Sequence, residues 1–367
     1  MDLSKIIELV NIKSFSLNQN DEIITYLQKQ FQPYSKEILL IKSPDSNKNN
    51  LIIGLNTMVK DTSAIILSGH IDTVIADEQA YKTNPYQATL INNNLYGLGV
   101  IDMKSFFACL LNNIQILSKL NYPIIITITC DEETTLNGIV SVTNTLKQRN
   151  ITPIISIIGE PTNMNICTTS KSCYEYQIDI KGKSCHSSNP NNGINAIYIA
   201  ANIISLIENL NLKYPSTTLN CGVINGGEKV NIVPNSARLK FDIRSNSKQN
   251  VNQVIQEINE QIQLLKTNYY GCEIETKQLL TIPALEKVAN GIVDYIIDNF
   301  SLTEKEFIGG CEAGYLQELG GESFIFGVGD LNLAHKANEF LDIKEFEIYN
   351  QIFCEMIQVL SNKLNIF

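Results

Sequence analysis

The residue types that support catalysis gather where apolar segments end. The segment "PIIITITC" (123–130) is β-branched and typical of a strand buried on both faces. It runs into "DEETTLNG", which places Glu132 and Glu133 side by side. Adjacent like charges repel, and successive side chains of an extended segment point to opposite sides. We therefore expect the two glutamates to serve different partners.

The chain has three histidines, His70, His186 and His335. A lone histidine is more often structural than a metal ligand, but two features favour a ligand role for His70. In "SGHIDTV" it shares one side of an extended segment with Asp72, and a metal-bound imidazole commonly donates its other N–H to a carboxylate. His70 also lies at the same predicted rim of strand ends as three further carboxylates, Asp102, Glu133 and Glu160.

Asp102 follows "LYGLGVI" at the start of a predicted helix. It is either an ordinary N-cap residue or a ligand shared between two metal ions. Two histidines and three carboxylates suit two Zn²⁺ ions, and the one remaining positive charge is what a hydroxide neutralises. Such a site activates water but still needs a base, and spacing alone does not decide whether Glu132 or Glu133 has that role.

Alternating strands and helices are expected to position these residues. We predict helices over 3–10, 21–31 (capped by Asn20 or Asp21) and 102–120, and strands over 38–44, 50–56, 63–74, 123–130 and 152–163. This alternation indicates an α/β domain with a mostly parallel sheet. In such sheets functional groups collect at the carboxyl ends of the strands, where the residues above fall.

The pattern changes near residue 173. Strand, helix, two strands, helix and strand follow one another, which is the β-α-β-β-α-β order of a ferredoxin-like α+β domain. After residue 281 the α/β pattern resumes with a helix over 285–299, a strand over 323–329 and a helix over 344–363. We therefore expect a catalytic domain built from 1–172 and 282–367, with an inserted domain at 173–281.

Composition narrows the function classes. The 367 residues carry a formal net charge of −10, which argues against a nucleic-acid or membrane partner. The start of the chain lacks the basic and apolar regions of a signal peptide, and no apolar run approaches the roughly 20 residues of a transmembrane helix. Nine cysteines without a CxxC pair fit a reducing cytoplasm. We expect a cytoplasmic protein that acts on a small molecule.

Taken together, seven segments closely resemble the M20 family of dinuclear zinc hydrolases. They are "SGHIDTV", "GLGVIDMKSFFACLL", "TCDEETTLNG", "IGEPTN", "GKSCHSSNPNNGINAI", "VNIVPNSARLKFDIR" and "GVGDLNLAHKANEF". The resemblance implies two zinc ions per subunit, one held by His70, Asp102 and Glu160 and the other by Asp102, Glu133 and His335. It also implies Glu132 as general base, Asp72 as the residue that orients His70, and His186 as a contact to the scissile carbonyl or its oxyanion.

Within this family the segments are most similar to members that convert N2-acetyl-L-ornithine to ornithine and acetate, a step of arginine biosynthesis. Arg244, with Asn231, is then expected to bind the substrate carboxylate, since arginine binds carboxylates bidentately; the alternative is a solvated or ion-paired arginine. Glu312 either faces the substrate's ammonium group or is an ordinary loop carboxylate.

Several alternatives stay open from the sequence. Other substrates are N-acetylcitrulline, another acyl amino acid, succinyl-diaminopimelate or a dipeptide, and Co²⁺ or Mn²⁺ could replace zinc. A non-catalytic binding protein on the same fold would be expected to lack a ligand or the base, and none is missing here. The resemblance further implies a homodimer formed through the inserted domain, which acts as lid and dimerisation domain. We expect His186 to act in the active site of the partner subunit.

Overall fold

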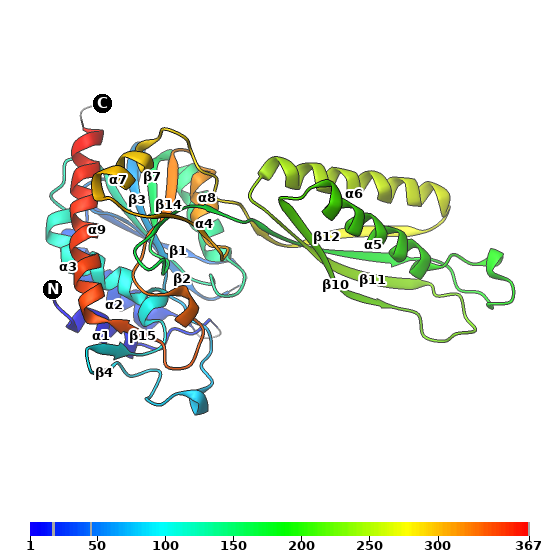
Figure 1. Cartoon of the computed structure of the whole chain (residues 1–367), viewed down its shortest axis with the longest axis horizontal. Coiled ribbons are helices and arrows are strands. Elements are labelled where there is room, and N and C mark those ends of the chain that lie inside the picture. Colours follow the sequence, from blue (N-terminus) through cyan, green and yellow to red (C-terminus); the bar gives the residue numbers. More distant parts are fainter. Residues whose placement is uncertain (17–18, 45, 366–367) are drawn as a thin grey trace. The chain divides into compact units, whose positions relative to one another are not determined.

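A computed structural model describes residues 1–16, 19–44 and 46–365 and divides the chain into two compact units. The larger unit comprises Met1–Thr169, Lys287–Phe307 and Cys311–Phe367, and the smaller comprises Ser170–Glu286 and Ile308–Gly310. In the colour scale of Figure 1, which follows the sequence, the smaller unit is green to yellow, and segments of the larger unit precede and follow it in the chain. The smaller unit is thus an insertion in the sequence of the larger.

An eight-stranded sheet forms the centre of the larger unit, in the order β1-β2-β6-β3-β7-β14-β8-β13. The strands are β1 (Glu37–Lys42), β2 (Asn49–Gly54), β3 (Thr62–His70), β6 (Ile124–Thr129), β7 (Ile151–Ile158), β8 (Ile166–Ser170), β13 (Glu304–Phe307) and β14 (Glu322–Ile325). The four central strands β6, β3, β7 and β14 run parallel, and β1, β2 and β8 pair antiparallel around them. The predicted fold class is confirmed.

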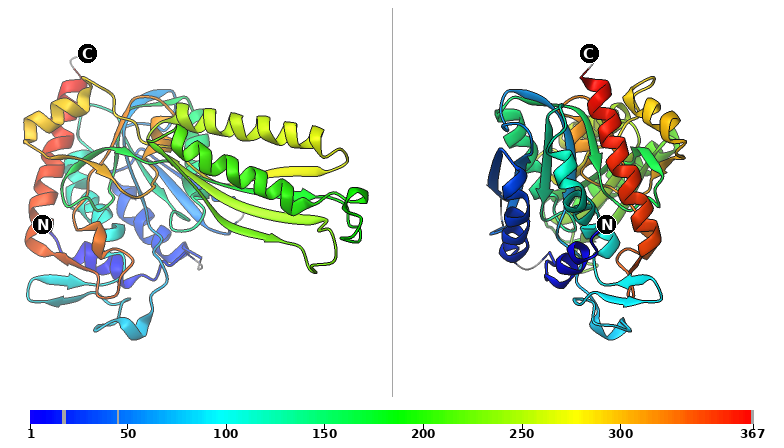
Figure 2. Two further views of the ribbon diagram at one scale, coloured as in Figure 1. Left: turned by 45° about the vertical axis from the view of Figure 1, so that its right-hand side comes forward. Right: turned by 90° about the vertical axis from the view of Figure 1, so that its left-hand side faces the viewer.

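Helices cover both faces of this sheet (Figures 1 and 2). One group is α1 (Ser4–Asn11), α2 (Asp21–Phe31), α3 (Ser105–Leu117), α7 (Ile292–Phe300) and α9 (Ile343–Leu364). These helices share one buried apolar core with alternate strand residues such as Ile65 and Leu67. On the other face α4 (Asn137–Gln148) and α8 (Ala313–Gln317) contact each other and the sheet. Burial on both faces explains why the central strands are apolar throughout.

Two local features of the larger unit bear on the site. A small sheet, β15-β5-β4, joins β4 (Thr89–Ile91) and β5 (Asn94–Tyr96) to β15 (Phe340–Asp342). The segment Val100–Leu117 is long and apolar enough to cross a membrane, but 83% of it is buried inside the unit. This segment is the core helix α3 together with the turn that precedes it.

The smaller unit has the predicted β-α-β-β-α-β order. Its elements are β9 (Cys173–Lys181), α5 (Ala196–Lys213), β10 (Thr217–Gly226), β11 (Ser236–Ser245), α6 (Lys248–Asn268) and β12 (Glu273–Ile282). The antiparallel sheet has the order β10-β11-β9-β12, and its apolar side chains pack with those of α5 and α6 in a separate core. Asn195 and Ser247 cap the two helices by accepting backbone N–H groups of their first turns.

Two expected helix starts are wrong. The helix expected from residue 102 begins at Ser105, because Asp102 and Met103 have non-helical backbone angles. The helix expected from 285 begins at Ile292, after Leu285 has paired with Ser170 in an isolated bridge.

The cap expected for 21–31 and the strand expected to reach residue 130 also differ. Asn20 occupies the N-cap position of α2 but does not cap it, because its side chain bonds the backbone of Asn49 instead. Strand β6 ends at Thr129, and Glu132 and Glu133 lie in a turn rather than on an extended segment. The argument that extended geometry separates these two glutamates is therefore wrong.

Candidate active site

The carboxyl ends of the parallel strands supply most of the expected site residues. His70 is the last residue of β3 and pairs in register with Thr129, the last residue of β6. Glu132 and Glu133 follow β6, and Glu160 follows β7 by two residues. Because these ends lie at one edge of the sheet, residues distant in the chain come together there.

His70, Asp102 and Glu160 form one half of the cluster. His70 Nε2 lies 3.1 Å from Asp102 Oδ1 and 3.6 Å from Glu160 Oε1, and all three side chains are buried. Glu160 Oε1 has no hydrogen-bond partner among the described residues. A buried carboxylate oxygen without a partner is costly unless a cation neutralises it, so this half has the character of a metal site.

His335 and Glu133 form the other half. His335 Nε2 lies 2.8 Å from Glu133 Oε1 and 3.1 Å from Asp102 Oδ2. Asp102 therefore presents one carboxylate oxygen to each histidine, while possible ligand atoms of His70, Asp102 and Glu133 all lie within 4.8 Å of one another. The five expected ligands come together as two groups that share Asp102.

The charges in this cluster favour bound cations. Burial, together with Asp102, raises the pKa of Glu160 well above its usual value, and burial likewise raises the pKa of Glu133. Hydrogen bonds to Asp102 and Glu133 raise the pKa of His335 to about 10. The raised pKa values show that the cluster carries an excess of negative charge, which neutral histidines do not compensate. Nitrogen and oxygen donors of this kind fit divalent metal ions such as Zn²⁺.

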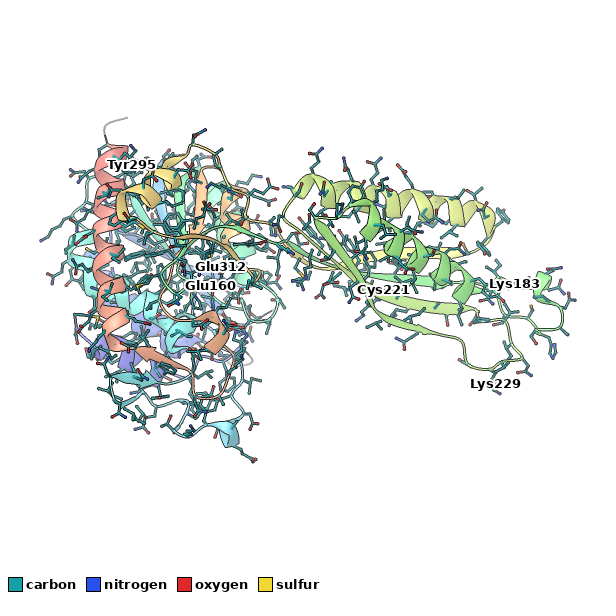
Figure 3. The ribbon with its side chains drawn as sticks, viewed as in Figure 1. Glu160, Lys183, Cys221, Lys229, Tyr295 and Glu312 are labelled. Atoms are coloured by element: carbon teal, nitrogen blue, oxygen red, sulfur yellow. The ribbon has the colours of Figure 1, made fainter. Side chains whose placement is uncertain are left out.

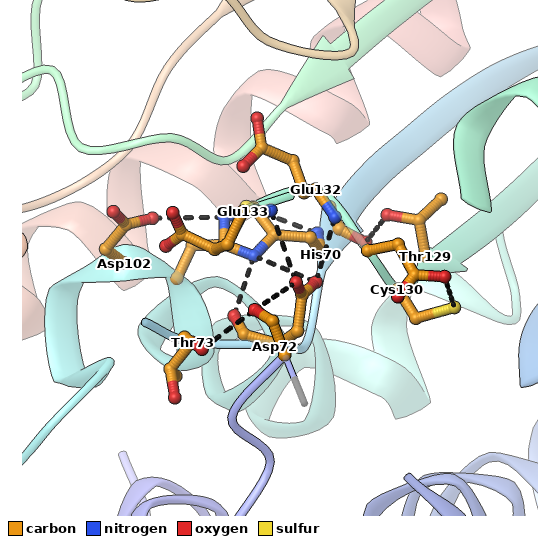
Figure 4. Close-up of polar contacts among 12 residues, drawn as sticks. His70, Asp72, Thr73, Asp102, Thr129, Cys130, Glu132 and Glu133 are labelled. Atoms are coloured by element: carbon orange, nitrogen blue, oxygen red, sulfur yellow. Dashed lines mark hydrogen bonds and ion pairs between the residues drawn. The ribbon is translucent and has the colours of Figure 1, made fainter. Parts of the chain in front are cut away.

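Asp72 organises the turn that carries the two glutamates (Figure 4). Its carboxylate accepts the backbone N–H groups of Glu132 and Glu133, each at 3.2 Å, and the hydroxyl of Ser16 at 2.9 Å. The expected orienting contact to His70 comes from the Asp72 backbone carbonyl, 2.9 Å from Nδ1, while the nearer carboxylate oxygen is 3.7 Å away. Asp72 therefore contacts both the imidazole and the glutamate turn.

The Glu132 carboxyl group lies among the charged side chains of the cluster. Burial raises its pKa well above the usual value, and the negative charges of Glu133 and Asp72 add to this effect while His70 opposes it. A raised carboxylate pKa brings a group closer to neutral pH, where a general base is most effective. The adjacent Asp131 is held by Lys48, Ser43 and Ser46, which fixes the start of the turn.

Glu312 is held between strands of the large sheet. It is 1% exposed, and its carboxyl group accepts hydroxyl groups of Ser68 (2.8 Å) and Thr129 from neighbouring strands. Figure 3 labels Glu312 and Glu160 in the larger unit. Glu312 is therefore a buried contact between β3, β6 and the start of α8, and its contact with the substrate's ammonium group stays a prediction.

The remaining expected residues lie in the smaller unit. His186 and Asn231 are exposed neighbours, because Ser187 N–H donates to the Asn231 carbonyl and His186 pairs with Ile232 in an isolated bridge. Their loops adjoin the end of the sheet at which β9 ends and β11 begins. His186 Nδ1 lies 2.8 Å from the Ser188 hydroxyl.

Arg244 lies at the opposite end of that sheet. It is near the end of β11, half-buried, and donates to Asp242 at 3.1 Å. Arg244 is eight residues beyond Ser236, and at the rise of a β-strand this corresponds to about 27 Å. Arg244 and Asn231 of one chain therefore lie too far apart to bind the same carboxylate, and their expected role in substrate binding stays a prediction.

Sequence reasoning missed Glu339, which is 2% exposed. Its carboxyl oxygens accept backbone N–H groups of Gly99 (2.9 Å), Ile101 (2.8 Å) and Asp102 (3.4 Å). Burial raises the pKa of Glu339 to about 8, while the N–H groups act in the opposite direction. Its position four residues after His335 in "AHKANEF" was the available signal.

Known proteins resemble this chain in sequence. Residues 168–269 match the family model of the peptidase dimerisation domain. The chain is 30% identical to the acetylornithine deacetylase of Buchnera aphidicola subsp. Schizaphis graminum (strain Sg), over 96% of this chain and 95% of that protein.

Two solved structures share the fold. A tripeptidase from Staphylococcus aureus gives a TM-score of 0.76 at 23% identity, with 98% of each chain covered. A dinuclear metal-binding peptidase of the M20 family from Bacillus subtilis gives a TM-score of 0.69 at 17% identity, covering 98% of this chain and 97% of the other.

Proposed function

Because the chain belongs to the M20 family of metal-dependent amidohydrolases, we propose that it deacetylates N2-acetyl-L-ornithine to ornithine and acetate, a step of arginine biosynthesis. The observation that carries a hydrolytic role is the shared position of Asp102, whose two carboxylate oxygens each lie 3.1 Å from a different histidine. The similarity to acetylornithine deacetylases over nearly the full length supports this substrate.

We propose that two Zn²⁺ ions are held per subunit, one by His70, Asp102 and Glu160 and one by Asp102, Glu133 and His335. The unpartnered oxygen of Glu160 and the charge balance of the cluster support this assignment. Co²⁺ or Mn²⁺ would suit the same donors. When bound, such ions lower the pKa of water and polarise the substrate carbonyl.

The residues of the chain have distinct roles in this proposal. Glu132 removes the proton from the attacking water and delivers it to the leaving nitrogen of the amide. Asp72 holds the Glu132 turn and His70 through the contacts described above. His186 donates to the oxyanion that develops on the acetyl carbonyl, which a positioned donor stabilises selectively in the transition state.

Substrate binding in this proposal draws on two copies of the chain. Arg244 binds the substrate carboxylate in the site of its own subunit, since it lies at the end of the small sheet from which both connections to the larger unit leave. His186 and Asn231 lie about one strand length, roughly 27 Å, from that end. We propose that they act in the site of the partner subunit, and that the protein is a homodimer formed through the smaller unit.

The surface beside His186 supports association. Tyr198 (62% exposed), Val230 (102%) and Ile232 (40%) are apolar side chains open to solvent around a groove of about 1000 Å³. Exposed apolar groups of this kind favour burial against a partner. Each of the nine cysteines is a free thiol, which supports a cytoplasmic location.

A substrate panel tests the proposal. Purified protein loaded with Zn²⁺ is given N2-acetyl-L-ornithine, N-acetyl-L-citrulline, N-succinyl-L,L-diaminopimelate and dipeptides, and products are identified by mass spectrometry. We expect the highest kcat/KM for N2-acetyl-L-ornithine. A higher kcat/KM for another compound would replace the substrate, and inactivity on the whole panel with two metal ions bound would reject the deacylase assignment.

A further inference from the structure

Glu339 belongs to a segment that reaches the site in two ways. His335, four residues earlier, points its Nε2 at Asp102 and Glu133. Immediately after Glu339, Phe340 pairs with Tyr96 as β15 joins β5, and the Glu339 carbonyl accepts the N–H of Gly97 at 3.2 Å. The small sheet thus fixes Glu339 beside the turn that leads to Asp102.

That turn directs backbone N–H groups into the protein interior. Gly99 has a left-handed φ of 74°, and Asp102 and Met103 are non-helical, so α3 does not begin until Ser105. The N–H groups of Gly99, Ile101 and Asp102 all face the Glu339 carboxyl group, which is their acceptor. Buried N–H groups without an acceptor are costly, so this conformation depends on Glu339.

The conformation of this turn determines where the Asp102 carboxylate lies. Its two oxygens face His70 and His335, each at 3.1 Å, and a rotation of the turn would move both contacts together. We propose that Glu339 is a positioning residue that holds Asp102 between two metal positions, so that its loss weakens metal binding at both. This inference rests on the ligand role of Asp102 in the proposed function.

Metal titration of the metal-free, full-length protein tests the inference. We would compare wild type with Glu339→Gln, which keeps the size of the side chain but turns one accepting oxygen into an amide group that donates. Partners that orient metal ligands typically contribute 10- to 100-fold to metal affinity. By isothermal titration with Zn²⁺, we expect both dissociation constants to rise by about 10- to 100-fold.

Glu322 provides a matched control in the same unit. Its carboxylate accepts the backbone N–H groups of Ile292 (2.6 Å) and Val293 (3.1 Å) at the start of α7. Glu322→Gln therefore removes a comparable carboxylate–backbone contact that involves no proposed ligand. We expect its Zn²⁺ affinities to stay within about twofold of wild type, even where thermal unfolding shows a similar loss of stability.

The outcomes separate the inference from the proposed function. Wild type that binds fewer than two Zn²⁺ ions would contradict the proposed function. Wild type that binds two ions while Glu339→Gln keeps both affinities, loses only one, or matches Glu322→Gln would overturn the inference alone. If Glu339→Gln does not fold, Glu339→Asp decides, because its carboxyl group is one methylene too short; unchanged affinities in that variant would also overturn the inference.

Discussion

In the larger unit the candidate ligands already face one another and three of the five are buried, whereas in the smaller unit His186 and Asn231 are exposed and Arg244 is half-buried against Asp242. The first group is held by strand ends, by Asp72 and by Glu339, all within one compact unit. The second group is spread over both ends of one sheet.

This difference suits two separate roles, metal binding in the larger unit and substrate contacts in the smaller unit. A metal centre needs several charged groups fixed at short distances, and one densely packed unit supplies that arrangement. Contacts to a substrate need to form only when it binds, so exposed residues on a separate unit can provide them. If so, substitutions in the larger unit affect metal or chemistry, and those in the smaller unit affect substrate contacts while metal stays bound.

The largest effect is expected for Glu132→Gln. This change removes the proton acceptor at nearly constant size, and general bases contribute about 10²–10⁴-fold. We expect kcat to fall by that factor with both metal ions retained by elemental analysis. Glu133→Gln is the matched control and should instead lower metal occupancy. Equal metal loss in the two variants would show that their roles have been separated incorrectly.

A smaller effect is expected for His186→Ala. Loss of one oxyanion donor typically lowers kcat by about 10²–10³-fold. Metal content and thermal stability should match wild type because the side chain is exposed. Ser188→Ala, which removes only the hydroxyl beside Nδ1, serves as control and should change kcat far less. Normal kcat in the His186 variant would remove this residue from the mechanism.

The smallest effect is expected for Arg244→Lys, which keeps the charge but loses the bidentate fork. KM for the acyl amino acid should rise while kcat changes little. Amidation of the substrate carboxylate should then cost the variant much less than wild type. Arg238→Lys, on the same strand and paired with Asp179, should leave KM unchanged. An equal cost of amidation in variant and wild type would show that Arg244 does not hold the carboxylate.

The sequence predicted those site residues that lie next to strands recognisable from their apolar residues. His70 ends one apolar strand and Glu160 follows another, and strand ends of a parallel sheet gather at one edge. The backbone conformation at Asp102 was harder to predict. The apolar periodicity of the helix includes residues of the turn before it, and this turn is held by Glu339, 237 residues away in the chain. The burial of Glu312 could not be predicted for the same reason, since its partner Ser68 is 244 residues distant. Local patterns carry no record of such contacts.

The position of Arg244 relative to Asn231 could not be predicted from the sequence. Its segment "LKFDIR" alternates as a strand should, and its ability to bind a carboxylate was visible from residue type. The distance to Asn231 follows only when β11 is known to run unbroken from Ser236 to Ser245. That continuity shows that Arg244 and Asn231 of one chain lie too far apart to bind the same carboxylate.

Subunit complementation tests most directly the claim that two copies complete each site. His186→Ala and Glu132→Gln are each expected to form a nearly inactive homodimer. When they are mixed equally under conditions that exchange subunits, half of the dimers are mixed and one site of each mixed dimer has both groups intact, so about a quarter of all sites should be active. Recovery of activity to that level on the substrate found by the panel would agree with a trans role for His186. No recovery, with subunit exchange demonstrated by mass spectrometry, would contradict it.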